Sequence, residues 1–237
     1  MRTKSGIKLG IGIPQGFPDG NIDLELIQRF VSRAEVLGYD DLWVSEQITG
    51  KLPILEATTL LGYVAALSKT IRIGTSVIVS NLRQPVQLAK SLSSLDNLSG
   101  GRLTVGLGLG TNTNMYSAYG LNREHRVSRF MEGVDIMKAL WTQSSVDFKG
   151  RYAQLEGVTM EPKPVQRPHP PLWFGARVPD AMRRAVKNGD GWMGAGSATN
   201  EDYLKEHAEL RRILQEETRD PATFSVSKRV YLAISND

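Results

Sequence analysis

The stretch from Ile71 to Gly110 reads IRIGTSVIVSNLRQPVQLAKSLSSLDNLSGGRLTVGLGLG, and it contains two apolar strands separated by one helix. Residues 70–80 are rich in β-branched side chains, and residues 102–110 form a second apolar run. Residues 85–100, between them, begin with a proline and end with a glycine, which are typical helix boundaries. Two buried strands joined by a helix predict a parallel βαβ unit, because parallel neighbours need a long crossover connection.

The same alternation of strands and helices precedes this unit. It consists of two further strands and two amphipathic helices: strands 7–14 and 40–46, and helices 23–38 and 54–68. Asp23 is suited to cap the start of the first helix, and Gly38 is suited to end it. The strands begin about every thirty residues, as parallel βα units require.

Residues 143–171 interrupt this alternation after a helix at 126–142. They contain a predicted short hairpin around Lys149 and Gly150 and then five prolines, which cannot serve a central strand. We interpret the segment as an insertion that lies over one face of the domain. A proline-stiffened linker between two domains is the alternative, but the βα pattern resumes directly afterwards, which favours an insertion.

The remaining residues add three strands and two helices: strands 172–177, 190–196 and 223–235, and helices 179–189 and 200–218, the last with Asn200 as its expected cap. This series predicts an α/β fold, a (β/α)₈ TIM-type barrel that forms a single domain over residues 1–237. A doubly wound sheet is the competing architecture. The sequence offers seven such strands and no eighth, so the chain is either a fragment or a barrel that closes differently.

Composition excludes several classes of function. The chain has 237 residues, no cysteine and three histidines without metal-ligand spacing, so we expect no metal site. A net charge of +4, evenly spread, does not indicate nucleic-acid binding. No apolar run is long enough for a membrane span, and the N-terminus has no signal-peptide core. We therefore expect a cytoplasmic enzyme or binding protein.

Sites in parallel α/β folds form at the carboxyl ends of the strands, which here are rich in glycine and amides and poor in acids and bases. Such a rim suits a flat, anionic cofactor that is held by backbone groups and supplies the chemistry itself. Gly106, Gly108 and Gly110 alternate along the end of the fourth strand. They either let the strand approach the cofactor closely or allow tight packing inside the fold.

Four stretches resemble the bacterial-luciferase-like superfamily of flavin- or deazaflavin-dependent oxidoreductases. They are GYDDLWVSE (38–46), the stretch from Ile71 to Gly110, YAQLEGVTMEPKPVQRPHPPLWFGAR (152–177) and RRAVKNGDGW (183–192), in family order and with family-like spacing. The resemblance covers nearly the whole chain. It implies a (β/α)₈ barrel with an insertion after the fourth strand, and a flavin or deazaflavin ring lying across the strand ends.

The resemblance also implies positions for the cofactor. Members of the family often have a non-prolyl cis peptide in the third strand, which by alignment falls at Ser76–Val77 and forms a bulge behind the ring. The end of the fourth strand then adds further ring contacts: Gly108, Gly110, Thr111 and Asn112. Backbone N–H groups of two later loops hold the cofactor phosphate, with a possible charged contact from Arg177: Gly175, Ala176, Arg177, Gly194, Ala195, Gly196 and Ser197.

The sequence departs from many relatives after the second strand, where an acidic residue and a histidine are common. This chain has Glu46 and Gln47 instead, and glutamine cannot act as an acid at neutral pH. These two residues are nevertheless the catalytic candidates. Glu46 either accepts a hydrogen bond from substrate or ring or forms a structural salt bridge, and Gln47 can bond a ring carbonyl. Thr111 stands where some deazaflavin-dependent sugar dehydrogenases have a glutamate, so their substrate is not carried over.

The resemblance implies an oxidoreductase that acts on a small organic substrate. With FMN the enzyme would activate O₂ as a monooxygenase, and with coenzyme F-420 it would transfer hydride; the shared motifs serve both. A non-catalytic flavin-binding protein with a shortened barrel is the alternative, and an inactive fragment of a longer enzyme is a third possibility. Relatives usually form dimers, so a homodimer is expected by resemblance.

Overall fold

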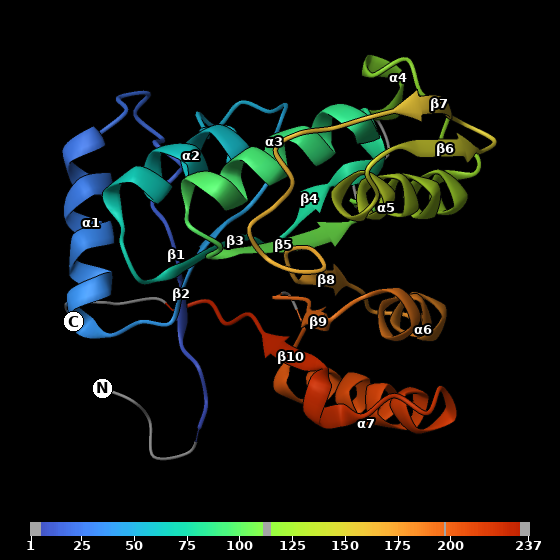
Figure 1. Cartoon of the computed structure of the whole chain (residues 1–237). Helices are drawn as coiled ribbons and strands as arrows, with labels where there is room; N and C mark the ends of the chain where they lie inside the picture. The colour runs from blue at the N-terminus through green and yellow to red at the C-terminus, as the bar shows by residue number, and fades with distance from the viewer. Residues whose placement is uncertain (1–5, 111–114, 197, 233–237) are drawn as a thin grey trace. The chain divides into compact units, whose positions relative to one another are not determined.

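The structure is a computed structural model, and it describes residues 6–110, 115–196 and 198–232. The chain has an α/β fold that divides into two compact units, Met1–Pro170 and Pro171–Asp237. Each unit is built from parallel strands with helices between them (Figure 1).

The first unit contains five parallel strands: β1 (Gly10–Gly12), β2 (Asp41–Val44), β3 (Arg72–Thr75), β4 (Ile78–Val79) and β5 (Leu103–Gly108). Strands β1, β2, β3 and β5 neighbour one another in that order, and β4 pairs with β5 beyond the end of β3. Spatial order therefore follows chain order within this unit. A doubly wound sheet needs a reversal of strand order, and the unit contains none among its described strands.

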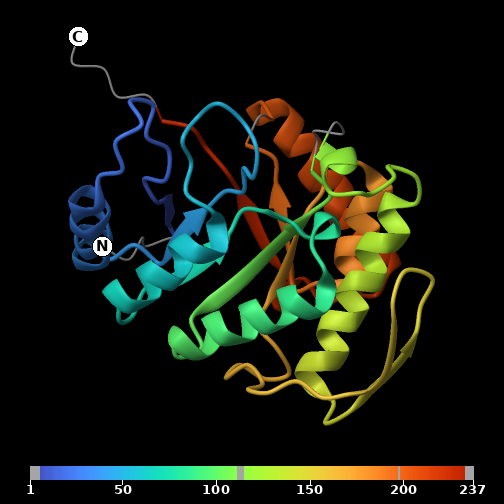
Figure 2. The same ribbon diagram turned by 90° about the horizontal axis from the view of Figure 1, so that it is seen from above.

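Helices α1 (Leu24–Leu37), α2 (Ala57–Leu67) and α3 (Pro85–Leu98) connect these strands and lie side by side against them (Figure 2). Both predicted boundaries of α1 are confirmed. The side chain of Asp23 accepts the N–H of Leu26 at 2.7 Å, and Gly38 ends the helix with a φ of 78°, a conformation that favours glycine.

The core of the first unit forms where these helices meet the sheet. All six residues of β5 are buried, as expected for a strand covered on both faces. The buried hydroxyl of Thr75, at the end of β3, is satisfied by β5, because Thr75 Oγ1 donates to the carbonyl of Gly106 at 2.8 Å and accepts the N–H of the same residue at 2.9 Å. These two hydrogen bonds between β3 and β5 fix the register of the two strands close to their carboxyl ends.

The predicted third strand at 70–80 is not one continuous strand. It divides into β3 and β4 at a cis peptide bond between Ser76 and Val77, which confirms the position that the resemblance implied. The pairing changes here: β3 pairs with both β2 and β5, and the N–H of Ser76 still donates to Val44 of β2, whereas β4 pairs with β5 alone among the described strands. A short 3₁₀ helix, η1 (Ser80–Leu82), follows. We call residues 76–79 the bulge.

The part of the first unit after β5 contains two helices and one hairpin: α4 (Met115–Ala118), α5 (Arg126–Thr142), β6 (Val146–Lys149) and β7 (Gln154–Val158). Strands β6 and β7 are antiparallel, so the predicted hairpin at 149–150 is confirmed. It lies beside α5 (Figure 1), where Glu132 accepts N–H groups from the turn at residues 151–153. The proline-rich segment then follows α3, since Gln166 bonds both oxygens of Asp96.

The second unit contains three parallel strands in the order β8, β9, β10: β8 (Leu172–Gly175), β9 (Gly191–Gly194) and β10 (Ser225–Lys228). Helices α6 (Pro179–Asn188) and α7 (Asn200–Glu216) connect them, and a short 3₁₀ turn, η2 (Pro221–Thr223), precedes β10. The expected cap of α7 was wrong by one residue. Thr199, not Asn200, accepts the N–H of Asp202, at 3.0 Å, because the helix already includes Asn200.

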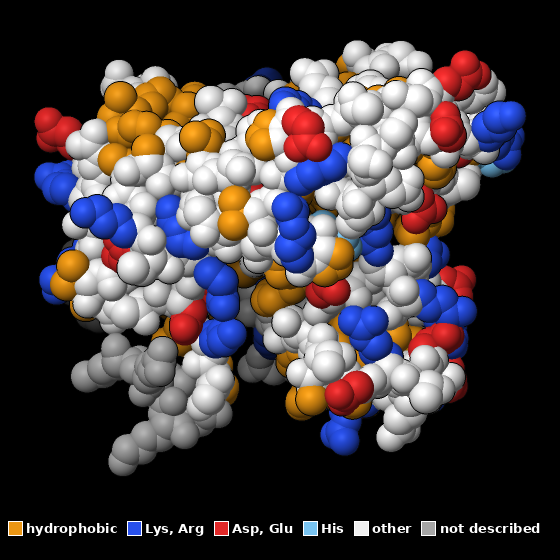
Figure 3. Space-filling view, viewed as in Figure 1, with side chains coloured by type: hydrophobic (Ala, Val, Ile, Leu, Met, Phe, Trp, Pro, Cys, Tyr) orange, Lys and Arg blue, Asp and Glu red, His pale blue; other side chains and the backbone are white. Residues whose placement is uncertain are grey.

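Strand β10 is shorter than the predicted 223–235, and residues 233–235 of that range lie outside the described residues. No helix in the described ranges is long and apolar enough to cross a membrane. The same ranges contain no group of three histidine, aspartate or glutamate side chains suited to a metal ion. Basic and acidic side chains are interspersed on the face drawn in Figure 3.

Glu35 joins the last turn of α1 to the segment that enters β3. One carboxylate oxygen, Oε1, accepts the N–H groups of Lys69, Thr70 and Ile71 at 2.5–3.0 Å, and also the hydroxyl of Thr70. Burial alone would raise the pKa of Glu35, but these hydrogen bonds outweigh it and lower the pKa to about 2. The ionised carboxylate therefore stabilises the folded state.

We expect Glu35→Ala to lower the free energy of unfolding by about 2 kcal/mol at neutral pH, because three backbone N–H groups lose their charged acceptor. A depressed pKa contributes stability above the unfolded value of 4.5 that is lost as the pH falls towards about 2. The difference from wild type should therefore shrink between urea unfolding at about pH 7 and at about pH 3.5. Exposed Glu25, on the same helix, is the control, and an equal loss in Glu25→Ala would contradict the assignment.

Candidate functional site

The candidate site lies where β2, β4 and β5 of the first unit end. In parallel sheets the carboxyl ends of neighbouring strands meet at one edge, and loops there position reactive groups. In this unit that edge combines Glu46 after β2, the bulge before η1, and Leu109 and Gly110 after β5.

Glu46 is held by two partners on the segment that follows β3. Its side chain is only 2% exposed. Oε2 accepts the backbone N–H of Val79 at 2.5 Å, and Oε1 accepts Nε of Arg83 at 2.9 Å and also Nη2 of the same guanidinium. Both carboxylate oxygens are thus engaged within the protein, as a buried charge requires.

Arg83 extends this contact to α2. Its Nη2 also donates to Oε1 of Glu56 at 2.7 Å, and Glu56 caps α2 by accepting the N–H of Thr59. Burial would raise the pKa of Glu56, but the bonds from Thr59 and Arg83 lower it to about 2. Glu46, Arg83 and Glu56, here called the Glu46 network, therefore tie the end of β2, the bulge and the start of α2 together.

The glycines at the end of β5 make room for the bulge. A Cβ on Gly108 would lie 2.5 Å from Cγ2 of Val77, and a Cβ on Gly110 would lie 2.9 Å from Cγ1 of Val79. Gly110 also has a φ of +70°, which other residues rarely adopt. Tight internal packing thus accounts for both glycines, because the side chains of Val77 and Val79 in the bulge lie against the end of β5.

Gln47 is half-buried and folds against Gly50, where an added Cβ would lie 2.6 Å from its Nε2. Tyr119 of the segment after β5 is electrostatically coupled to Glu46 and Arg83. Burial raises the pKa of the Tyr119 phenol, and the charge of Glu46 raises it further. The phenol is therefore a neutral O–H donor at physiological pH.

Asn81 and Ser80 are the site residues that the sequence analysis missed. Both belong to η1, and the two residues are 3% and 8% exposed, respectively. Asn81 Nδ2 donates to the hydroxyl of Tyr116 at 2.5 Å, whereas Asn81 Oδ1 and Ser80 Oγ have no hydrogen-bond partner in the part of the chain that the structure describes. The available signal was their place at the carboxyl end of the predicted strand 70–80, where Ser80 is the last residue and Asn81 the next.

The second unit contains the loop predicted to bind a phosphate near Arg177. Gly175 ends β8, and the carbonyl of Ala176 accepts Nε1 of Trp192 at 2.7 Å. The guanidinium of Arg177 donates to Oε1 of Glu206 at 3.1 Å, while Oε2 of that glutamate is buried and has no hydrogen-bond partner among the described residues. Arg177 thus makes a salt bridge inside this unit.

The loop after β9 is built around small residues. A Cβ on Gly194 would lie 3.1 Å from the ring of Tyr203, and one on Gly196 would lie 2.9 Å from Tyr231. Ala195 accepts the N–H of Ala198 at 3.2 Å, just before α7. The first turn of α7 contains Glu201 and Asp202, whose charges already complement the helix N-terminus.

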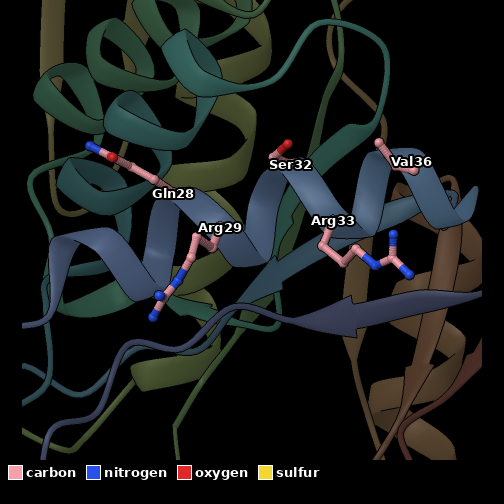
Figure 4. Close-up of a pocket in the computed structure, with 5 residues that line it drawn as sticks. All are labelled: Gln28, Arg29, Ser32, Arg33 and Val36. Atoms are coloured by element: carbon pink, nitrogen blue, oxygen red, sulfur yellow. The ribbon is translucent and has the colours of Figure 1, made fainter.

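Three predicted cofactor contacts, Thr111, Asn112 and Ser197, lie outside the described residues. A depression on the outer face of α1 is lined by residues of that helix alone: Gln28, Arg29, Ser32, Arg33 and Val36 (Figure 4). No residue of the Glu46 network is among those that line it. The strand ends therefore remain the candidate site of the first unit.

We predict that Arg83→Met destabilises the protein by about 3–5 kcal/mol, because Glu46 is left as a buried charge without a counter-ion. Glu46→Gln combined with Arg83→Met should recover much of that loss, since the uncompensated charge is gone. Urea unfolding of wild type, both single variants and the double variant measures the coupling. Additive losses from the two substitutions would contradict a direct ionic link.

Comparison with known proteins adds to this geometry. A solved structure of the monooxygenase RslO1 from Streptomyces bottropensis matches 96% of this chain and 72% of its own, with a TM-score of 0.82 and 26% identity. F420-dependent glucose-6-phosphate dehydrogenase from Kineococcus radiotolerans is 31% identical over 174 residues, 69% of this chain and 50% of the relative. The oxygenase component of flavin-dependent trigonelline monooxygenase from Acinetobacter baylyi is 29% identical over 155 residues, which are 64% of this chain and 43% of the relative.

The chain spans about half the length of the curated relatives it matches. A family model described as luciferase-like monooxygenase matches residues 3–237, which is nearly all of this chain. The matched region includes the bulge, the Glu46 network and the loops of the second unit. The chain therefore belongs to the luciferase-like monooxygenase family.

Proposed function

We propose that the protein is an oxidoreductase that binds FMN or coenzyme F-420 and acts on a small organic substrate. The observation that carries the proposal is the bulge, whose position is fixed by the Glu46 network. It is followed by two buried polar atoms, Ser80 Oγ and Asn81 Oδ1, that have no hydrogen-bond partner among the described residues. Orphaned buried polar atoms at strand ends favour a ligand that supplies their partners.

The residues of this edge fit a flat ring. The side chains of Val77 and Val79 pack against the glycines of β5 and offer apolar surface to a ring. Asn81 and Ser80 add hydrogen-bonding groups beside that surface. Bound reduced FMN would supply oxygen activation, and bound coenzyme F-420 would supply hydride transfer. In this proposal Ser76, Val77, Gly108 and Gly110 hold the ring, together with Thr111 and Asn112.

Glu46 has a positioning role in this proposal. Because both of its oxygens accept hydrogen bonds from Val79 and Arg83, it holds the bulge in place. Gln47 bonds polar ring or substrate atoms without changing its charge. Tyr119, kept protonated by burial and by the charge of Glu46, can donate a hydrogen bond to the substrate.

Relatives support enzymatic turnover over simple flavin storage. One is named for a dehydrogenase that depends on F420 and another for a flavin-dependent monooxygenase, so both chemistries occur among proteins similar to this chain. We infer that the loops of the second unit at Gly175–Arg177 and Gly194–Ser197 hold the cofactor phosphate through backbone N–H groups. A (β/α)₈-type barrel, a cytoplasmic location and a homodimer are parts of the same proposal.

We expect the purified protein to bind FMN or coenzyme F-420 with a dissociation constant on the order of micromolar, measured by ligand fluorescence. Binding of FMN alone would assign oxygenation, and binding of F-420 alone would assign hydride transfer. If neither ring binds, the proposed function is wrong.

The variant Gly108→Ala tests where the ring lies. An added methyl must displace Val77, whose β-branched side chain has few alternative rotamers, so we expect ring binding to weaken by about tenfold or more. Gly62→Ala is the matched control, because no atom lies within 4 Å of its added Cβ and alanine favours helix α2. Unchanged affinity in a folded Gly108→Ala protein would place the ring elsewhere.

A further inference from the structure

The carboxamide of Asn81 has a fixed orientation. Nδ2 donates to the hydroxyl of Tyr116 at 2.5 Å, and that hydroxyl lies 3.3 Å from the carbonyl of Leu109, to which it donates. A phenol has one hydrogen, so it cannot also donate to Asn81. Tyr116 must therefore accept from a nitrogen, and the amide oxygen of Asn81 points away from it.

That oxygen is an acceptor without a donor. Asn81 is 3% exposed, and Oδ1 has no hydrogen-bond partner among the described residues. Native proteins rarely leave a buried acceptor in this state, and the missing donor is commonly a ligand or an enclosed water. The neighbouring Ser80 Oγ is buried and unpartnered in the same way. A polar ligand group that enters this region could thus form hydrogen bonds with two atoms, Asn81 Oδ1 and Ser80 Oγ.

Asn81 also lies at the place where a ring is proposed to bind. It follows the bulge by two residues, and its partner Tyr116 contacts Leu109 directly after β5. Val79 and Gly108 are paired across β4 and β5, so the amide lies beside the carboxyl ends of both strands. The unpartnered acceptor and the apolar surface of the bulge are therefore parts of one edge.

We propose that Asn81 Oδ1 accepts a hydrogen bond from the imide N–H of the cofactor ring and so selects a pyrimidinedione edge. This inference rests on the proposed function. The oxidised rings of FMN and coenzyme F-420 both offer one N–H between two carbonyls. Asn81 is complementary to that edge, because Oδ1 accepts and the second hydrogen of Nδ2 remains available to a neighbouring carbonyl.

Methylation of the imide nitrogen tests this contact directly, because it removes the N–H and leaves the rest of the ring intact. The probes are FMN and N3-methyl-FMN, and F-420 with its N3-methyl form if F-420 is the ring that binds. Wild type should bind the methylated ring at least about tenfold more weakly, since a site built to bond an N–H rejects a ligand without it. Asn81→Ala removes the acceptor and makes room for the methyl group, so the two affinities should become equal within about twofold.

The ratio of the two affinities separates recognition from a general structural effect. A variant that is merely less stable weakens both ligands alike and leaves the ratio unchanged. Asn97→Ala is the matched control, because this exposed asparagine of α3 lies outside the site, and its ratio should remain that of wild type. Tyr116→Phe, which releases the amide to rotate, should reduce the ratio and provides a second test if Asn81→Ala does not fold.

Equal binding of both rings by wild type would overturn the role of Asn81, as would a ratio that persists in a folded Asn81→Ala protein. Either result would mean that an enclosed water, not the ring, satisfies Oδ1. Failure of wild type to bind FMN and F-420 at all would instead overturn the proposed function itself.

Discussion

The buried contact between Glu46 and Arg83 is the interaction on which the candidate site depends. A carboxylate with 2% of its side chain exposed is tolerated only when its charge is compensated, and Arg83 supplies the counter-ion while Val79 supplies an N–H. The pair thereby joins the end of β2 to the segment after β3. Glu56 adds the start of α2, so these charged contacts connect the end of β2, the segment after β3 and the start of α2.

The shape of the strand ends depends on the contacts that Glu46 makes with Val79 and Arg83. Once Val79 is held by Glu46, the side chains of Val77 and Val79 occupy the space beside β5, and only glycine at positions 108 and 110 leaves room for them. These glycines are therefore required by internal packing, whether or not a ligand is bound. A support that is backed in this way is rigid, which suits a site that must hold a planar ring in one position.

The periodic features of the fold could be predicted from the sequence, whereas the contacts of single side chains could not. Apolar runs placed the strands, and Asp23 and Gly38 marked the ends of α1, because those signals are local. The third strand was predicted as continuous because the end of its pairing with β2 after Ser76 leaves no periodic trace. Glu46 was recognised as a candidate, but its partner Arg83 is 37 residues away, and no local pattern links them. Asn81 was missed for the same reason, since its importance arises from Tyr116 and from an acceptor left unpaired.

The account places the ring of the cofactor at the carboxyl ends of β4 and β5. Amide hydrogen exchange of the protein with and without saturating FMN, or F-420 if that is the ring that binds, tests this placement most directly. The account predicts slower exchange at Val79–Asn81 and Leu107–Gly110 in the presence of the ring, with α1 unchanged. Protection confined to the outer face of α1, or no protection at the strand ends despite binding, would contradict it.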